Sequence, residues 1–170
     1  MTPDLHASIR GRLLNVARAR KEEFGRTLAR YAAERWLYRL GASPARERCL
    51  LKGASLLEVW LADPYRRTQD VDLLASGAAD RAAVAALVSE VCAVECLDDG
   101  VTFDTATLAV DDIRAHDAYV GKRARFRAYL GKTWMPVQVD LGFGDALAVD
   151  PELVAFPVLL ADLPSPILRA

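Results

Sequence analysis

Apolar residues recur at helical spacing over the first forty residues of the chain. They fall into two series, with steps of mostly three or four residues. The first series is Leu5, Ile9, Leu13 and Val16, and the second is Phe24, Leu28, Tyr31, Arg35 and Leu37, in which Arg35 is a basic residue. Gly25 is a weak point between them, and Gly41 with the pair Ser43-Pro44 ends the second series. The pattern predicts two amphipathic helices that carry many arginines on their outer faces.

After residue 45 the pattern changes to short apolar runs that indicate strands, interrupted by two further helices. The expected strands cover residues 49–51, 71–74, 101–103, 107–110, 124–130 and 137–141, and the expected helices follow Ser55 and cover residues 78–94. Four prolines among the last twenty residues predict an irregular tail. We therefore expect N-terminal helices packed on the core (1–45), a core (46–150) and a tail (151–170). The predicted fold class is α+β, a mixed β-sheet flanked by helices, with an N-terminal helical extension.

The composition is that of a globular protein with a substantial core, because 52% of the 170 residues are hydrophobic and 26% are charged. The net charge of −1 gives no global basic field, although arginines and lysines crowd the first fifty residues and the segment 122–132. A nucleic-acid partner would have to bind such a local patch. Three cysteines without a C-x-x-C pair indicate ordinary thiols. No apolar run is long enough to span a membrane and no secretory signal is recognisable, so we expect a cytoplasmic protein without membrane contact.

Two aspartates interrupt one of the short apolar runs. Side chains at i and i+2 of a strand point to the same side, so Asp70 and Asp72 are expected to present two carboxylates close together. Such like charges repel unless a cation lies between them, and oxygen ligands favour Mg²⁺ or Mn²⁺ over zinc. Asp140, between Val139 and Leu141, is a third candidate catalytic acid and metal ligand. Three acids on adjacent strands can hold two metal ions about 3.5–4 Å apart, the arrangement used in phosphoryl transfer.

A turn of small residues, Gly53-Ala54-Ser55, lies where an expected strand gives way to a helix. Backbone N–H groups at the start of a helix favour a phosphate group, and small residues let it approach closely. Such a turn can also serve packing alone, and an acidic strand end can simply be solvated. The order of the elements favours phosphate chemistry: a Gly-small-Ser turn, a helix, the D-x-D strand, and later Asp140 between apolar residues.

This order resembles the DNA polymerase β-like nucleotidyltransferase superfamily, and several segments resemble its AbiEii/AbiGii family. Residues 52–57 (KGASLL) and 63–72 (DPYRRTQDVD) are similar to the family patterns K-G-[GA]-[TS]-x-L and P-x-R-x-[ST]-x-D-[ILV]-D. Residues 119–123 (YVGKR) and 137–145 (VQVDLGFGD) resemble Y-x-G-x-R and [IV]-D-[ILV]-G-x-G-D, and residues 31–40 resemble the family's N-terminal region. The resemblance covers nearly the whole chain and implies a nucleotidyltransferase fold.

Members of this family are toxins of toxin–antitoxin or phage-abortive-infection operons, and the MenT branch adds nucleotides, preferentially pyrimidines, to the 3′ end of tRNA. The resemblance therefore implies an enzyme that uses NTP and tRNA as substrates and has a cognate antitoxin as partner. It implies that Asp70, Asp72 and Asp140 hold the catalytic metal. The residues it implies around the triphosphate are Lys52, Gly53, Ala54, Ser55 and Arg66, with Thr68 next to the metal site.

The family pattern continues past a segment like residues 163–168 into a helical domain, whose A-E-K and R-x-K-D elements place a lysine and an aspartate in the active site. This sequence ends at Ala170, and no lysine follows Lys132. Two explanations are open: the chain is a truncated form, or another basic residue replaces the lysine. The candidates for that replacement are Lys122, Arg123 and Arg125.

Three functional hypotheses follow. The first is an active RNA nucleotidyltransferase, and the second is a catalytically incomplete module that binds nucleotide, RNA or a partner protein. The third keeps the fold but modifies an aminoglycoside or a protein, since fold alone does not set the acceptor. Arginines of the N-terminal helices favour a polyanionic acceptor; they are Arg10, Arg12, Arg18, Arg20, Arg26 and Arg30.

Overall fold

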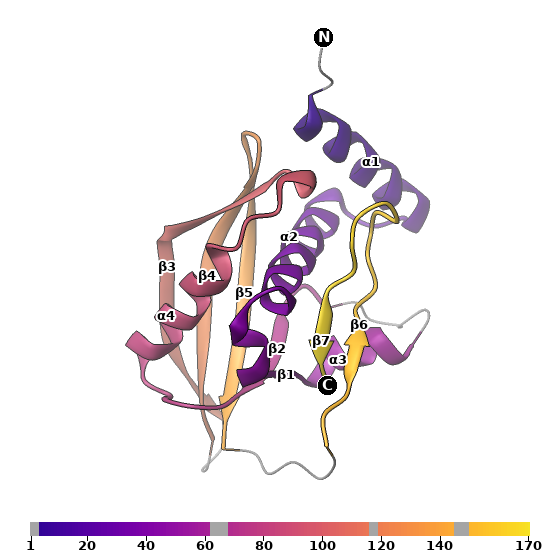
Figure 1. The fold of residues 1–170 in the computed structure, drawn as a ribbon. Coiled ribbons are helices and arrows are strands. Elements are labelled where there is room, and N and C mark those ends of the chain that lie inside the picture. Colours follow the sequence, from indigo (N-terminus) through magenta and orange to yellow (C-terminus); the bar gives the residue numbers. More distant parts are fainter. Residues whose placement is uncertain (1–3, 62–67, 116–118, 145–149) are drawn as a thin grey trace.

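A computed structural model describes residues 4–61, 68–115, 119–144 and 150–170 of the chain (Figure 1). Its helices are α1 (Leu5–Arg20), α2 (Phe24–Gly41), α3 (Gly53–Trp60) and α4 (Arg81–Cys92), with the 3-10 turns η1 (Pro44–Arg48) and η2 (Leu97–Asp99). Its strands are β1 (Cys49–Leu51), β2 (Val71–Ala75), β3 (Val101–Ala115), β4 (Tyr119–Leu130), β5 (Thr133–Phe143), β6 (Leu153–Ala155) and β7 (Ile167–Arg169). The predicted α+β class is confirmed.

Five strands form one mixed sheet in the order β1-β2-β5-β4-β3. β2 and β5 run parallel, whereas β1 pairs with β2, β4 with β5 and β3 with β4 in antiparallel fashion. In the parallel pair Asp72 lies directly opposite Asp140, and across the next ladder Asp140 lies opposite Arg123. The sheet therefore brings three charged residues from three adjacent strands side by side.

Helices α2 and α4 cover one face of this sheet (Figure 1). Alternate residues of the strands are buried beneath them, and the large side chains of α2 fill the middle of the core, where the Trp36 and Phe126 rings lie 6.3 Å apart. The buried sheet residues are Val71, Leu73, Ala124, Phe126, Ala128, Met135, Val137, Val139 and Leu141. Because side chains alternate along a strand, Asp72, Arg123 and Asp140 project from the opposite face. We call that surface the open face.

The N-terminal helices differ from the prediction in two respects. Helix α1 ends at Arg20, and its C-cap residue Lys21 adopts a left-handed conformation with φ +53°. The break therefore precedes Gly25, and this glycine lies in the first turn of α2. Helix α2 does not carry all its arginines outward, because Arg35 and Arg39 are buried. Arg39 forms an ion pair of 2.8 Å with the buried Asp99. A guanidinium can be buried when carboxylates and carbonyls satisfy it in this way.

Two further segments are more regular than expected. Residues 101–103 and 107–110 belong to one long strand, β3, whose register against β4 shifts between Asp104 and Ala109. The C-terminal residues, expected to be irregular, include β6 and β7, which pair antiparallel with each other. Strand β7 also packs against α2, where the Cβ of any residue replacing Gly41 would lie 2.5 Å from the carbonyl oxygen of Ile167. The C-terminal segment is thus attached to the core.

Candidate active site

Two aspartates form the centre of the candidate site. Asp72 of β2 and Asp140 of β5 are register partners on parallel strands, which lie about 4.8 Å apart, so their carboxylates are neighbours on the open face. Burial raises the pKa of Asp72, and the charge of Asp140 raises this pKa further, while Lys52 opposes both effects. The repulsion between the two acids is therefore only partly relieved by the protein itself.

The turn between β1 and α3 closes over Asp72. The Lys52 N–H donates to the Asp72 carbonyl oxygen at 3.1 Å, and the Ala54 N–H donates to the Asp72 carboxylate. Gly53 has φ +56°, and a Cβ at this position would lie 2.9 Å from Asp72 Oδ2. Only glycine therefore fits both the left-handed backbone and the close approach of the carboxylate.

The side chain of Lys52 lies against the same face. A Cβ on Gly142, two residues beyond Asp140 on β5, would lie 2.7 Å from Lys52 Nζ. The ammonium group thus lies above this glycine, and its charge lowers the pKa of Asp72. The site combines two acids, one lysine and the start of a helix, which is the set of groups that binds a metal–phosphate ligand.

Ser55 and Thr68 hold the backbone around Asp70. The buried Ser55 hydroxyl donates to the Asp70 carbonyl oxygen (3.3 Å) and accepts the Asp72 N–H (3.0 Å). The Thr68 hydroxyl donates to the same Asp70 carbonyl oxygen and accepts the Asp70 N–H, both at 3.1 Å. Asp70 itself is exposed just before β2, and its charge raises the pKa of both Asp72 and Arg123. The two hydroxyls therefore position the acidic segment.

Glu58 of α3 holds the segment that contains Thr68 and Asp70, and this role was not anticipated from the sequence. Its side chain is 5% exposed; Oε1 accepts the Thr68 N–H at 3.0 Å and Oε2 accepts from Arg30 at 3.1 Å. Arg30, one of the arginines of the N-terminal helices that favour a polyanionic acceptor, neutralises this buried acid. A single acid within the apolar run of α3 was the signal that could have indicated such a role.

Arg123 binds Asp140 through two parallel hydrogen bonds. Arg123 Nε and Nη2 donate to the two carboxylate oxygens, each at 2.8 Å, and the Asp140 contact raises the pKa of Arg123. Both oxygens of Asp140 therefore face a guanidinium. Over the described residues, no group of three or more aspartate, glutamate, histidine or cysteine side chains is arranged to hold a metal ion. The donor chemistry nevertheless fits a divalent cation at Asp72, with Asp70 and Asp140 beside it.

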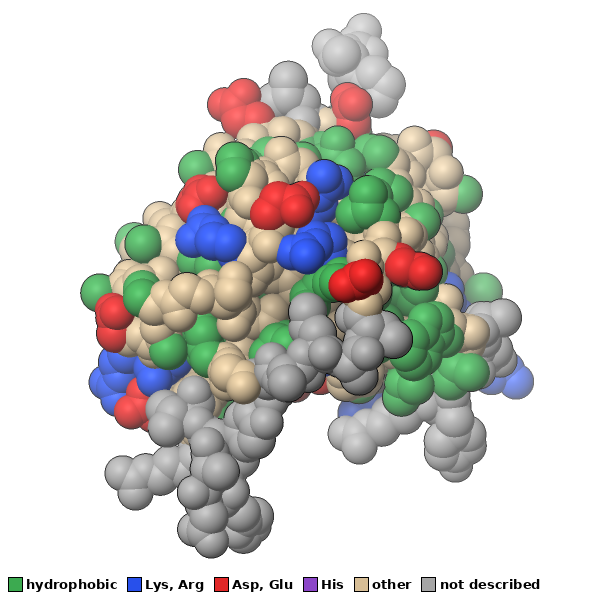
Figure 2. Space-filling model, turned by 60° about the horizontal axis from the view of Figure 1, so that its bottom comes forward, with side chains coloured by type: hydrophobic (Ala, Val, Ile, Leu, Met, Phe, Trp, Pro, Cys, Tyr) green, Lys and Arg blue, Asp and Glu red, His purple; other side chains and the backbone are tan. Residues whose placement is uncertain are grey.

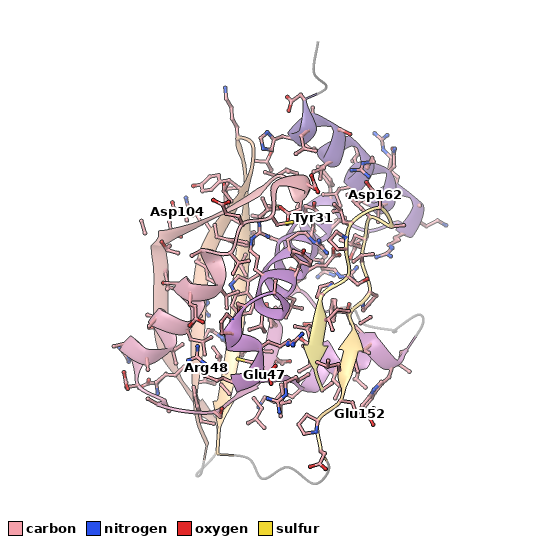
Figure 3. All side chains as sticks on the ribbon, in the orientation of Figure 1. Tyr31, Glu47, Arg48, Asp104, Glu152 and Asp162 are labelled. Carbon is pink, nitrogen blue, oxygen red and sulfur yellow. The ribbon has the colours of Figure 1, made fainter. Side chains whose placement is uncertain are left out.

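A groove of about 520 Å³ opens at the carboxyl ends of β2 and β5. Its lining includes Leu50, Leu74 and Phe143, with Arg48 and Arg169 among its charged residues. Glu47 and Arg48 lie toward the bottom of the molecule (Figure 3), the end that is turned forward in Figure 2, where basic and acidic side chains are interspersed. This volume lies within the usual range of small-molecule pockets, roughly 300–1,000 Å³. The groove begins two residues beyond Asp72, close enough to extend the site.

The structure gathers most of the predicted site residues at one place on the open face. It brings together Lys52, Gly53, Ala54, Asp72, Asp140 and Arg123, and it places Ser55, Thr68 and Asp70 directly beside them. Arg66 lies outside the described residues. Among the candidate replacements for the family lysine, Lys122 is buried on the opposite face and pairs with Asp112 at 3.1 Å. Arg123 is the candidate that contacts an acid of the site.

The mixed sheet, the opposed aspartates and the glycine turn define a protein with a nucleotidyltransferase fold. A family model described as nucleotidyl transferase AbiEii toxin, type IV toxin–antitoxin system, matches residues 35–170. The chain belongs to this family, since the match covers most of its length. The predicted family is thereby confirmed, and with it a nucleotidyltransferase toxin of a toxin–antitoxin system. No curated protein and no solved structure matches the chain. Within the described ranges, no helix is long and apolar enough to cross a membrane.

Proposed function

We propose that this chain transfers a nucleotide from NTP to an RNA acceptor, the 3′ end of tRNA, in a reaction that depends on a divalent metal ion. As in other toxin–antitoxin systems, a cognate antitoxin would hold the toxin in check in the cytoplasm. The observation that carries the proposal is the direct opposition of Asp72 and Asp140 beside the Lys52-Gly53 turn. The family supports the reaction class.

The reaction joins the 3′-hydroxyl oxygen of the acceptor to the α-phosphorus of NTP. The bond between the α-phosphorus and the bridging oxygen to the β-phosphate breaks, pyrophosphate leaves, and the hydroxyl proton passes to solvent. Mg²⁺ or Mn²⁺, held by Asp72 with Asp70 and Asp140, would supply Lewis-acid stabilisation of the phosphate oxygens. We expect the pyrimidine base of the nucleotide to lie in the adjacent groove.

The chain's own groups account for binding of the triphosphate. Lys52 provides a positive charge beside the acids, and the first N–H groups of α3 favour an anion. We assign to Arg123 the role of the basic residue that the family supplies from its C-terminal domain. Arg123 can do so because its guanidinium already lies at the acidic pair. It also orients the Asp140 carboxylate.

Incubation of the purified chain with each labelled NTP, Mg²⁺ and total tRNA tests the proposal. Label should enter tRNA, most efficiently from a pyrimidine nucleotide, and Asp72→Asn should abolish incorporation. Asp162→Asn is the matched control, because Asp162 is an exposed acid that pairs with Arg12 of α1 at 2.6 Å, away from the site (Figure 3). Equal incorporation by the Asp72 variant and the parent would reject the site.

The bidentate contact between Arg123 and Asp140 favours a second candidate function. A module whose third acid is engaged by arginine could bind nucleotide or RNA without turnover, or require a partner protein to complete the site. This candidate predicts saturable NTP binding with no incorporation of label. Incorporation by the chain alone would exclude it.

A further inference from the structure

The open face continues beyond the acids as a surface that carries three evenly spaced arginines. Arg123, Arg125 and Arg127 occupy every second position of β4, and we call them the arginine row. Arg125 Nε donates to Gln138 Oε1 at 3.1 Å, and the Arg127 guanidinium lies 4.6 Å from the centre of the Trp134 ring. Like Arg123, each arginine is thus ordered by a side chain of β5.

An exposed tryptophan, Trp134, ends this row. Its side chain is 53% exposed although it is one of the largest apolar groups of the chain. Trp134 lies six residues before Asp140 on β5, which corresponds to about 20 Å along the strand. The open face therefore offers an aromatic platform at one end, the acidic pair at the other, and ordered cations between them.

The described residues leave Arg125, Arg127 and Trp134 exposed, since α2 and α4 pack on the other face of the sheet (Figure 1). Besides Asp72 and Asp140, two further acids share the surface. Asp111 lies opposite Arg123 and Asp104 opposite Arg127, both on the edge strand β3, where Figure 3 places Asp104 at the outer margin of the sheet. Asp104 and Asp111 therefore lie on the rim of the sheet, and the three arginines of β4 lie between this rim and β5, which carries Asp140.

We infer that the open face binds the single-stranded 3′ end of the RNA acceptor, with one base stacked on Trp134. Aromatic platforms combined with basic side chains are the means by which proteins bind single strands. Tryptophan and arginine are also enriched at protein–protein interfaces, but a row of evenly spaced cations that leads to the acidic pair matches a strand of phosphates. The distance of about 20 Å places the stacked base roughly three nucleotides upstream of the reacting hydroxyl. This inference rests on the proposed function and adds the path of the acceptor.

Binding of a labelled six-nucleotide RNA in the absence of NTP tests the stacking. Trp134→Ala should weaken binding about tenfold, within the range of one base–aromatic stack. Trp134→Phe should retain most of the affinity and Trp134→Leu should not, because leucine keeps apolar bulk without a π-face. One abasic position, near the third from the 3′ end, should weaken binding as much as Trp134→Ala, and the combination should lose nothing further. The inference would be overturned if an abasic site at any position of the RNA weakened binding to Trp134→Ala as much as to the parent. It would also be overturned if Trp134→Leu bound the RNA as tightly as the parent.

The salt dependence of binding tests the arginine row separately. Arg125→Ala should lower the slope of log K against log salt by about 0.7, the value for one contact to a single strand. Arg81→Ala is the matched control, since Arg81 is an exposed arginine of α4 on the covered side of the sheet, and it should leave the slope unchanged. An equal change in both variants would refute a local contact.

The two proposals fail in distinguishable ways. Position-specific stacking without incorporation of label would support the RNA-binding surface and reject the enzymatic function. The parent and Trp134→Leu could instead incorporate label into tRNA equally well, with the same dependence on tRNA concentration. That result would reject the RNA-binding surface and leave the enzymatic function standing. Unfolding temperatures of all variants identify any loss that arises from misfolding.

Discussion

Glu58 offers the sharpest test of how the acidic segment is positioned. Its carboxylate accepts the Thr68 N–H at 3.0 Å and pairs with Arg30 at 3.1 Å, and Thr68 in turn holds the backbone of Asp70. We expect Glu58→Ala to release the Asp70 segment and thereby to weaken metal binding. Loss of such an outer contact typically lowers metal affinity by about 10–100-fold.

The same change also lowers stability, by an amount that the contacts allow us to estimate. Removing one partner of a fully buried ion pair costs about 3–5 kcal/mol, and an orphaned N–H group about 1–3 kcal/mol. The Arg30 side chain is 11% exposed, so water partly compensates its loss of a partner. We therefore expect about 3 kcal/mol for Glu58→Ala, which leaves a folded protein if the parent is stable by about 5–15 kcal/mol.

A second variant separates positioning from stability. Replacing the pair by Glu58→Leu with Arg30→Met removes both charges, which is often nearly neutral for stability, yet still deprives the Thr68 N–H of its acceptor. Asp99→Ala is the matched control, because it breaks the buried pair with Arg39, which lies nine residues beyond Arg30 on α2. Denaturant midpoints and the Mg²⁺ dependence of nucleotide incorporation are measured for each variant.

Both Glu58 variants should need about tenfold more Mg²⁺ for half-maximal incorporation, whereas Asp99→Ala should lose stability without a change in that requirement. If the double variant keeps the parent's Mg²⁺ requirement and rate, Glu58 serves stability alone and the positioning argument fails.

Three further substitutions test the site. Asp72→Asn should raise the unfolding temperature at neutral pH, since burial raises the pKa of Asp72 and its ionisation therefore destabilises the folded state. This increase in unfolding temperature should vanish below about pH 4, where Asp72 of the parent is protonated in both the folded and the unfolded state. Added Mg²⁺ should stabilise only the parent. Gly53→Ala, at φ +56° and against the Asp72 carboxylate, should cost about 1–2 kcal/mol in denaturation and more than tenfold in incorporation rate. Arg123→Lys cannot reproduce the two parallel bonds to Asp140, so incorporation should fall although the charge is kept; an unchanged rate would contradict the role of Arg123.

The parts of the fold that the sequence predicts well are those with one buried and one open face. The alternation from Ala124 to Leu130 predicts the second part of β4 (Tyr119–Leu130), because its even-numbered residues pack under the helices. Strand β3 was expected as two pieces, since an edge strand with a register shift carries polar residues that break the pattern. The burial of Arg39 could not be anticipated, because it meets its partner Asp99 sixty residues away.

The candidate site was predictable to the extent that its residues carry local patterns. The D-x-D segment and the glycine turn are local, and the structure places them in contact. The pairing of Arg123 with Asp140 depends on the register between β4 and β5, which the tight connection at residues 131–132 sets and which no single segment displays. Glu58 acts through Thr68, ten residues away, and its only trace in the sequence is an acid among apolar neighbours.

An aspartate between two apolar residues predicted both a strand and the direction of the aspartate side chain, because the two apolar neighbours are buried. Val139 and Leu141 are buried under the helices, so Asp140 between them must point to the open face. The same holds for Asp72 between Val71 and Leu73. A shift of β5 by one residue would bury Asp140 and expose its neighbours, at a large loss of apolar burial. The packing of the core therefore fixes the opposition of the two carboxylates, and a substitution such as Val139→Asp should abolish folding before it affects the chemistry.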